Sequence, residues 1–276
     1  MKKELLSPNY LKQLCLDYGL APSKAYGQNY LITESPIKKI LEAGELSRED
    51  TVVEVGPGFG VLTLALAPMV KKILCFEIEK TLEGYWADQQ QEFKNIEMIW
   101  GNVLTMLPKM KLPSTYKVLA NIPYQITSPI LRLFLEEIEH KPERMVLMVQ
   151  KEVAERVCAK PGDMSMLAIS VQYYGTPKIV TKVTKGNFWP SPKVDSAVLM
   201  IKPHKSIKNN YTDKEFFDLV RVGFSHPRKQ LWSNLSGVYK DIDFKTILKD
   251  ITKNEKIRAE ELSVQQWKNI LEKIKI

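Results

Sequence analysis

Residues 51–60 read Thr-Val-Val-Glu-Val-Gly-Pro-Gly-Phe-Gly, and a mostly apolar stretch follows them through Val70. A short β-branched run that ends at alternate glycines and leads into an apolar segment is typical of a strand, a tight turn and a helix in an α/β sheet. Glycine in such a turn lets the backbone approach a ligand closely. We therefore predict a strand over 51–55, a helix over 61–70 and a ligand site at the turn between them.

Further apolar runs continue this pattern along the chain. Four of them alternate with helical patterns, which predicts a parallel sheet with crossover helices. They cover residues 73–77, 96–100, 117–121 and 145–150. Two later runs, 178–184 and 195–201, flank a proline-containing loop, and we expect them to pair as an antiparallel hairpin at the sheet edge.

The composition restricts the classes of function. The formal net charge is +8 and the pI is near 9.1, which favours a polyanionic partner, although excess lysine also serves solubility. Three dispersed cysteines and three histidines predict neither a disulfide framework nor a metal site. The N-terminus lacks the apolar core of a signal peptide, and no stretch has the roughly 18 apolar residues of a membrane span. We expect a cytoplasmic protein without a metal.

The composition and pattern of the sequence change after the last predicted strand. Residues 203–210 are polar and predict a linker. Helical patterns follow at 215–224, 229–238, 243–251 and 263–276. Residues 203–276 hold 15 basic and 10 acidic side chains, so they carry much of the positive charge. We predict an α/β domain over 1–202 and a basic helical domain over 203–276, a plan that suits a monomer.

Three polar residues could complete a nucleoside site beside the glycine turn. Glu77 ends the next predicted strand, where a carboxylate can accept hydrogen bonds from ribose hydroxyls. Glu54 could fix the loop or bind an amine of the cofactor, and Asn102 could accept from an adenine amine. Since no pyrophosphate cradle or phosphate-binding lysine is visible, S-adenosylmethionine fits better than a dinucleotide. The alternative is a purely structural turn at Gly56 and Gly58, with Asn102 as another turn residue.

The tetrapeptide Asn121-Ile122-Pro123-Tyr124 ends a later strand and suits a planar amine. The side-chain oxygen of Asn121 and the carbonyl of Ile122 could accept both amine hydrogens, which favours a pyramidal nitrogen with its lone pair aimed at a methyl group. Pro123 restricts the conformation of Ile122 and thereby the direction of its carbonyl. Tyr124 offers a face on which an extruded base can stack. The alternative is a common Asn-Pro type turn.

A second aromatic segment, Phe188-Trp189-Pro190-Ser191-Pro192, follows the first strand of the predicted hairpin. Phe188 could cover the other face of the base, and the alternative is a core phenylalanine in a proline-rich loop. Together these motifs predict methyl transfer to the exocyclic nitrogen of a nucleobase.

Read together, these residues resemble the ribosomal RNA small-subunit adenine N6-dimethyltransferases over nearly the whole chain. The resemblance implies a Rossmann-like, S-adenosylmethionine-dependent methyltransferase with a small all-helical, RNA-binding C-terminal domain. It implies transfer of four methyls to the N6 atoms of two adjacent adenosines in the 3′-terminal hairpin of the small-subunit rRNA. This reaction would take place on an assembling small subunit during ribosome biogenesis. The matching motifs are Gly27-Gln28-Asn29-Tyr30-Leu31, residues 54–63, 121–131 and 188–198, and Arg258-Ala259-Glu260-Glu261-Leu262-Ser263.

The resemblance also implies roles for single residues. Gln28, Asn29 and Leu31 belong to the motif that lines the cofactor pocket. Gly56 in the glycine turn, and Glu77 and Asn121 at the ends of two predicted strands, would contact the cofactor or the target amine. Two positions depart from the family, because Tyr30 stands where phenylalanine is usual and Asn102 stands where aspartate is usual.

The basic segment 224–231 resembles the family's basic C-terminal stretch, diluted by His226 and Pro227. Arg228 and Lys229 are therefore expected to contact RNA phosphates, which position a nucleic acid without reading its sequence. Each could instead be an ordinary solvated charge.

Three rival functions remain open on the sequence alone. A macrolide-resistance methylase acting on large-subunit rRNA shares the chemistry, but Pro57 and the basic segment resemble the small-subunit family more. DNA adenine methylation is disfavoured because no target-recognition insertion is visible. A non-catalytic RNA-binding assembly or transcription factor on the same fold is a rival of another class, against which Asn121, Pro123, Tyr124 and Glu77 argue.

Overall fold

The computed structural model describes residues 2–21, 28–205 and 210–274. By its internal contacts the chain divides into two compact units, Met1–Ala154 with Gly175–Pro203, and Glu155–Tyr174 with His204–Ile276. We expected one boundary after residue 202. Instead, the segment Glu155–Tyr174 groups with the C-terminal unit, because Ala168, Ile169 and Tyr173 are buried in the same apolar core as Phe216 and Trp267.

Within the described residues, the first unit contains a seven-stranded sheet of order β4-β3-β2-β5-β6-β9-β7. Its first five strands in this order are parallel, and β9 lies antiparallel between β6 and β7. These strands are β2 Thr51–Val55, β3 Lys72–Glu77, β4 Ile96–Trp100, β5 Lys117–Asn121, β6 Arg144–Gln150, β7 Gly175–Val183 and β9 Ser196–Pro203. The parallel sheet and the antiparallel pair at its edge are therefore confirmed.

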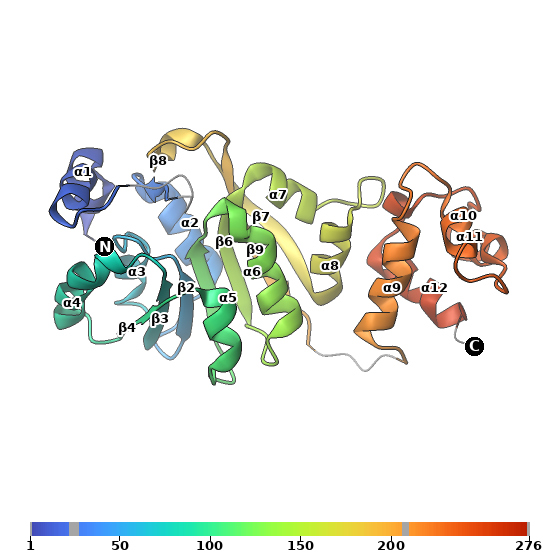
Figure 1. Ribbon diagram of the computed structural model, residues 1–276, viewed down its shortest axis with the longest axis horizontal. Coiled ribbons are helices and arrows are strands. Elements are labelled where there is room, and N and C mark those ends of the chain that lie inside the picture. Colours follow the sequence, from blue (N-terminus) through green and yellow to red (C-terminus); the bar gives the residue numbers. More distant parts are fainter. Residues whose placement is uncertain (1, 22–27, 206–209, 275–276) are drawn as a thin grey trace. The chain divides into compact units, whose positions relative to one another are not determined.

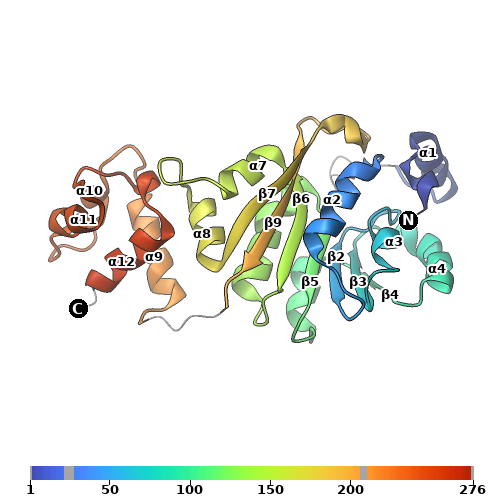
Figure 2. The same cartoon turned by 180° about the vertical axis from the view of Figure 1, so that it is seen from behind.

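Helices cover both faces of this sheet. α2 (Glu34–Gly44) lies on the face seen in Figure 2, and α6 (Thr127–Arg132) lies on the face seen in Figure 1. The central strands are apolar because both their faces are covered, as the buried run of β6 illustrates. The other helices of this part are α1 Pro8–Asp17, α3 Thr63–Leu66, α4 Glu83–Glu92 and α5 Val103–Met106. Helix α7 (Lys151–Val157) contains the boundary between Ala154 of the first unit and Glu155 of the second.

Shorter elements connect these helices and strands. A two-stranded sheet pairs β1 (Tyr30–Leu31) with β8 (Phe188–Trp189), which the sequence did not predict. The helix expected over 61–70 was wrong in extent, since only Thr63–Leu66 is α-helical and turns surround it. Single turns of 3₁₀-helix occur at Lys3–Leu6, Lys80–Leu82, Leu107–Lys109, Tyr124–Ile126, Lys185–Asn187 and Ala259–Glu261, and a π-helical turn at Leu133–Glu137.

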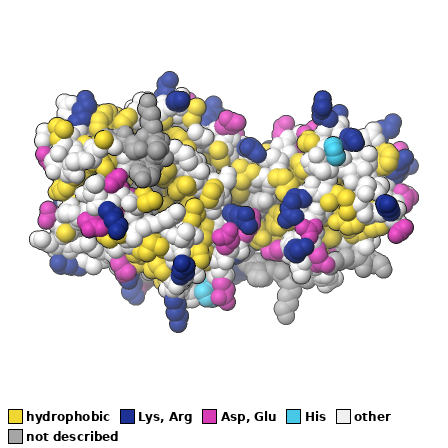
Figure 3. All heavy atoms as spheres, viewed as in Figure 1, with side chains coloured by type: hydrophobic (Ala, Val, Ile, Leu, Met, Phe, Trp, Pro, Cys, Tyr) yellow, Lys and Arg dark blue, Asp and Glu magenta, His cyan; other side chains and the backbone are white. Residues whose placement is uncertain are grey.

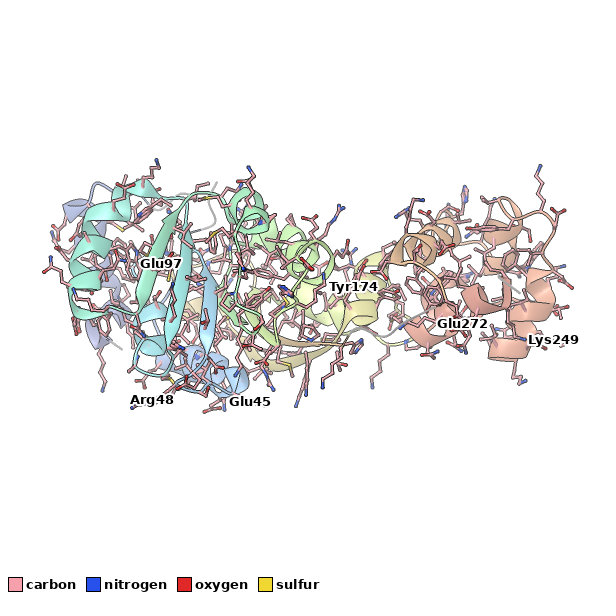
Figure 4. The ribbon with its side chains drawn as sticks, turned by 90° about the horizontal axis from the view of Figure 1, so that it is seen from below. Glu45, Arg48, Glu97, Tyr174, Lys249 and Glu272 are labelled. Carbon is pink, nitrogen blue, oxygen red and sulfur yellow. The ribbon has the colours of Figure 1, made fainter. Side chains whose placement is uncertain are left out.

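The second unit is helical in the residues that the structure describes. Its helices are α8 Met166–Tyr174, α9 Asp213–Gly223, α10 Leu231–Ser236, α11 Phe244–Thr252 and α12 Val264–Ile274. Thr212 begins α9 with a reciprocal capping box to Glu215. Figure 4 labels Tyr174 and Glu272, which belong to α8 and α12 of this unit. No helix in the described ranges is long and apolar enough to cross a membrane.

A buried ion pair holds the amino end of β5. Lys117 is 8% exposed, and its Nζ donates to Asp50 Oδ2 at 2.9 Å and to the carbonyl of Glu45 at 2.6 Å. Glu45 and Arg48 lie in the loop that leads into β2 (Figure 4). The ion pair therefore fixes β5 relative to β2 at one end, and Asn121 lies at the other end of β5.

The strand order reverses between β2 and β5. The chain runs from β2 outward through β3 to β4, and then returns to place β5 on the other side of β2. In open α/β sheets such a reversal leaves a crevice beyond the carboxyl ends of the strands, where ligands bind. The glycine turn after β2 and the tetrapeptide after β5 meet at this crevice.

Candidate active site

A cavity of about 190 Å³ lies at the carboxyl ends of β2, β3, β4 and β5. All nine residues predicted to bind the cofactor line it. They are Gln28, Asn29, Leu31, Glu54, Gly56, Gly58, Glu77, Asn102 and Asn121. Gly27, the first residue of their N-terminal motif, lies outside the described residues. The structure thus brings together segments that are separated by up to 93 residues in the sequence, from Gln28 to Asn121.

The glycine turn needs residues without a side chain. Gly58 has φ +54°, and a Cβ on it would lie 2.8 Å from Cε1 of Tyr30. The carbonyl of Gly58 accepts from Trp86 Nε1 at 2.9 Å, and the carbonyl of Phe59 accepts from the Tyr85 hydroxyl at 2.7 Å. Two aromatic side chains of α4 therefore hold the turn in place, and its backbone forms one wall of the cavity.

Glu77 ties the ends of β2 and β3 together. Its Oε1 accepts from the backbone N–H groups of Ile78 and Glu79, both at 2.9 Å, and its Oε2 accepts from that of Gly58 at 3.0 Å. Burial raises the pKa of Glu77, and these three hydrogen bonds oppose the shift. A carboxylate has about four acceptor positions, so one position on Oε2 is left for a ligand hydroxyl in the part of the chain described.

Glu54 is a buried carboxyl at the base of the cavity, only 1% exposed. Burial is the main cause that raises the pKa of Glu54 to about 8, and the nearby Glu77 carboxylate contributes to this shift. Its Oε2 faces the Cys75 thiol at 3.9 Å on the neighbouring strand. Burial therefore favours the protonated form of the Glu54 carboxyl in the folded protein.

Asn102 both begins α5 and lines the cavity. Its Oδ1 accepts from the backbone N–H of Leu104 at 3.0 Å, which is an N-cap bond. The turn and ligand interpretations of Asn102 are thus compatible, since the oxygen has a second lone pair. The cap occupies one of the two acceptor positions that an adenine amine could use.

Asn121 is fixed by a contact with a distant segment. Its Nδ2 donates to the backbone carbonyl of Asn29 at 3.1 Å. Because only the NH₂ group can donate to a carbonyl, this bond sets the orientation of the side-chain amide and leaves Oδ1 as the acceptor. Asn121 and Pro123 line the cavity, whereas the side chain of Ile122 is 2% exposed and packs in the core.

Tyr124 and Phe188 do not line the cavity. Tyr124 begins a 3₁₀ turn, and its hydroxyl lies 2.7 Å from the hydroxyl of Ser196. Phe188 is 3% exposed and lies opposite Leu31 in the small sheet of β1 and β8. This position supports the core interpretation of Phe188, while its contact with a base stays a prediction.

Sequence reasoning missed the contribution of the N-terminal residues. Leu5 and Leu11 are each 1% exposed and line the cavity. A signal was present, since Ser7 and Pro8 form a helix start and Leu11, Leu14 and Cys15 follow at helical spacing. Pro57, Ile78, Gly101, Gln125 and Ile126 also line the cavity beside the predicted residues.

Arg228 and Lys229 lie in the loop between α9 and α10 and are exposed. The helix predicted from residue 229 was wrong in extent, because α10 begins at Leu231. On the face visible in Figure 3, Lys and Arg side chains are interspersed with Asp and Glu rather than gathered in one patch. Contact of Arg228 and Lys229 with RNA stays a prediction.

The chain matches the family model of ribosomal RNA adenine dimethylase over residues 21–275. It is 38% identical over 265 residues to ribosomal RNA small subunit methyltransferase A of Dehalococcoides mccartyi, covering 94% of this chain and 90% of that protein. It is 36% identical to the protein of the same name of Ligilactobacillus salivarius, covering 97% of this chain and 95% of that protein.

Solved structures show the same fold. A dimethyladenosine transferase from Plasmodium falciparum superposes with a TM-score of 0.74 at 25% identity, covering 89% of this chain and 97% of that chain. The 23S rRNA methyltransferase ErmE superposes with a TM-score of 0.75 at 24% identity, covering 90% of this chain and all of that chain, and this likeness concerns the fold alone. The expected Rossmann-like methyltransferase fold with a helical C-terminal part is therefore confirmed, and the chain belongs to the ribosomal RNA adenine dimethylase family.

Proposed function

We propose that this protein is an S-adenosylmethionine-dependent rRNA adenine N6-dimethyltransferase of the small ribosomal subunit. The observation that carries the proposal is the convergence of the glycine turn, Glu77 and Asn121 on one cavity. Relatives named small-subunit methyltransferases, at 38% and 36% identity over more than nine-tenths of this chain, support the choice of substrate over large-subunit rRNA.

The residues around the cavity fit S-adenosylmethionine. The turn at Gly58 offers backbone where a Cβ would collide with Tyr30, and Glu77 keeps an acceptor position for one ribose hydroxyl. The carboxyl of Glu54 and the cap residue Asn102 supply further polar atoms at the cavity wall. When bound, this cofactor supplies an electrophilic methyl group. Leu5 and Leu11 would exclude water from the site.

The tetrapeptide after β5 would hold the target adenine. Asn121 Oδ1 accepts one hydrogen of the N6 amine, and the carbonyl of Ile122 accepts the other. Both bonds favour a pyramidal nitrogen whose lone pair points at the cavity. Tyr124 stacks on the extruded base, and its ring face suits the positive charge that develops on nitrogen. Orientation of the two reactants supplies the largest effect, roughly 7–11 kcal/mol in favourable cases.

The target would be two adjacent adenosines in the 3′-terminal hairpin, each receiving two methyls. The protein would act as a cytoplasmic monomer on an assembling subunit, with Arg228 and Lys229 contacting phosphates. In a direct test, the protein and labelled S-adenosylmethionine are incubated with unmodified small subunits in one reaction and with large subunits in another. Label on the small subunits alone is expected. Label on the large subunits alone would favour the resistance-methylase activity, and tight RNA binding without label would favour a non-catalytic factor.

A further inference from the structure

A buried hydroxyl lies behind the target-binding tetrapeptide. Ser196 is the first residue of β9 and is 0% exposed. It pairs with Gln150 of β6 on one side and with Val183 of β7 on the other. A hydroxyl in such a site costs free energy unless it has a hydrogen-bond partner. Its Oγ lies 2.7 Å from the hydroxyl of Tyr124, which is 72 residues earlier in the sequence.

The backbone that carries this serine is fixed from several directions. Asp195, the preceding residue, accepts from the N–H of Lys151 through its carbonyl at 3.0 Å. The Asp195 side chain accepts from the N–H of Lys185 through Oδ1 at 2.9 Å. Because the strand is paired on both sides, the hydroxyl of Ser196 can move only by rotation about its own Cα–Cβ bond. It therefore offers a rigid anchor.

The Tyr124 side chain is held at both ends by this arrangement. Its backbone follows Pro123, which lines the cavity, and its hydroxyl is bound to the sheet through Ser196. Rotation about the Cα–Cβ bond of Tyr124 would carry the hydroxyl away from Ser196 and break the hydrogen bond. Rotation about the Cβ–Cγ axis leaves the hydroxyl oxygen in place, so the bond fixes where the ring lies. Loss of the partner would leave the half-buried hydroxyl unsatisfied, so the ring would turn toward water.

We propose that Ser196 is a positioning residue that fixes the ring of Tyr124 for stacking on the target adenine. The inference rests on the proposed function, because it requires Tyr124 to contact the base. This positioning role of Ser196 differs from a purely structural role, in which the serine would only pack in the core of the sheet. A core role would affect stability alone, whereas a positioning role affects the methyl-transfer step through Tyr124.

The test is a double-mutant cycle on the full-length protein. Single-turnover methyl transfer is measured with saturating labelled S-adenosylmethionine and unmodified small subunits, for wild type, Ser196→Ala, Tyr124→Phe and the double variant. Each single change should slow transfer by about three- to tenfold, the effect of one hydrogen bond. The double variant should be no slower than the single ones, because all three lack the same bond. The dissociation constant of S-adenosylmethionine should stay within about twofold.

Two further variants separate positioning from stability. Ser196→Cys keeps the branching of the side chain but replaces the hydroxyl by a larger sulfur atom that is only a weak hydrogen-bonding group, and it should be slow like Ser196→Ala even where its melting temperature stays near the wild-type value. Ile201→Val removes one buried methylene from the same strand, away from Tyr124, and should transfer methyl groups at the wild-type rate despite a lower melting temperature.

The outcomes distinguish this inference from the proposed function. A wild-type protein that transfers no methyl to small subunits would overturn the proposed function, and with it the inference. A wild-type protein that is active, together with full activity of Ser196→Ala, would overturn the inference alone. Losses that multiply in the double variant would also overturn it, because the two residues would then act independently.

Discussion

Nδ2 of Asn121 donates to the carbonyl of Asn29 at 3.1 Å, although 92 residues separate them in the sequence. This bond joins the end of β5 to the segment that precedes β1, and both residues line the same cavity. It determines which atom of the Asn121 amide faces a ligand. In the proposed reaction, this bond would orient the acceptor for the target amine before the substrate binds.

Asn121→Ala should slow methyl transfer by roughly 10²–10³, because it removes a preorganised acceptor at the reacting nitrogen. Asn121→Asp keeps an acceptor but loses the bond to Asn29, and should be less impaired than Asn121→Ala. Single-turnover rates on unmodified small subunits give the comparison, and binding to subunits should largely survive in both variants. Undiminished turnover of Asn121→Ala would remove this mechanism.

Glu77→Ala should weaken binding of S-adenosylmethionine by more than about tenfold, since it removes a ribose acceptor and the carboxylate that holds the N–H of Gly58. Glu79→Gln is the matched control, because Glu79 accepts from the neighbouring Thr81 on the protein surface. Calorimetric titration with the cofactor measures both. An unchanged dissociation constant for Glu77→Ala would contradict the ribose assignment.

Gly58→Ala should lower the free energy of unfolding by about 2 kcal/mol, because alanine disfavours φ +54° and its Cβ would approach Tyr30. It should also narrow the cofactor cavity and weaken cofactor binding. Gly186→Ala is the control, since no atom lies within 4 Å of the added Cβ. Chemical denaturation and cofactor titration of both variants test this expectation, and equal stability of the two variants would count against the described turn.

Asn102→Asp should tighten cofactor binding by about three- to tenfold. Aspartate has two oxygens, so one can keep the cap bond to Leu104 while the other accepts from the adenine amine as a charged acceptor. Asn102→Ala, which loses both roles, should bind more weakly than wild type. If Asn102→Asp bound no more tightly than the wild-type protein, Asn102 would be a helix cap and nothing more.

Glu54→Gln should change how stability depends on pH. The pKa of Glu54 is raised to about 8 in the folded protein, from 4.5. The folded state therefore retains a proton that the unfolded chain releases, and the free energy of unfolding falls as pH rises from about 4.5 to about 8. Glutamine does not titrate, so the variant should gain stability relative to wild type across this window. Denaturant unfolding at several pH values measures the free energy of unfolding of both proteins. If this free energy changed with pH equally in the wild type and the variant, the raised pKa of Glu54 would be contradicted.

Much of the fold could be predicted because its parallel strands are buried on both faces. Apolar runs located β2 to β6 to within one residue, and the acidic and amide residues that end them were predicted to line a site. Those predictions needed only local patterns and the rule that parallel strands end at one edge.

Contacts between short, distant segments could not be predicted in this way. The pairing of Tyr30 with Trp189 involves strands of two residues each, which leave no periodic signal. The same holds for the Tyr124–Ser196 bond. The helical spacing of Leu11, Leu14 and Cys15 predicts a helix, but it does not indicate that Leu5 and Leu11 line the cavity. The sequence left two interpretations of Phe188 open, contact with a base and a place in the core, and its burial opposite Leu31 depends on the unpredicted small sheet.

One measurement tests the methyl-transfer reaction and its rRNA target together. The most direct measurement incubates the protein with labelled S-adenosylmethionine and small subunits made without the modification, and then identifies modified nucleotides by mass spectrometry of the digested rRNA. We predict dimethyladenosine at two adjacent positions in the 3′-terminal hairpin. Label elsewhere in the rRNA, or no label despite binding to the subunit, would contradict the claim.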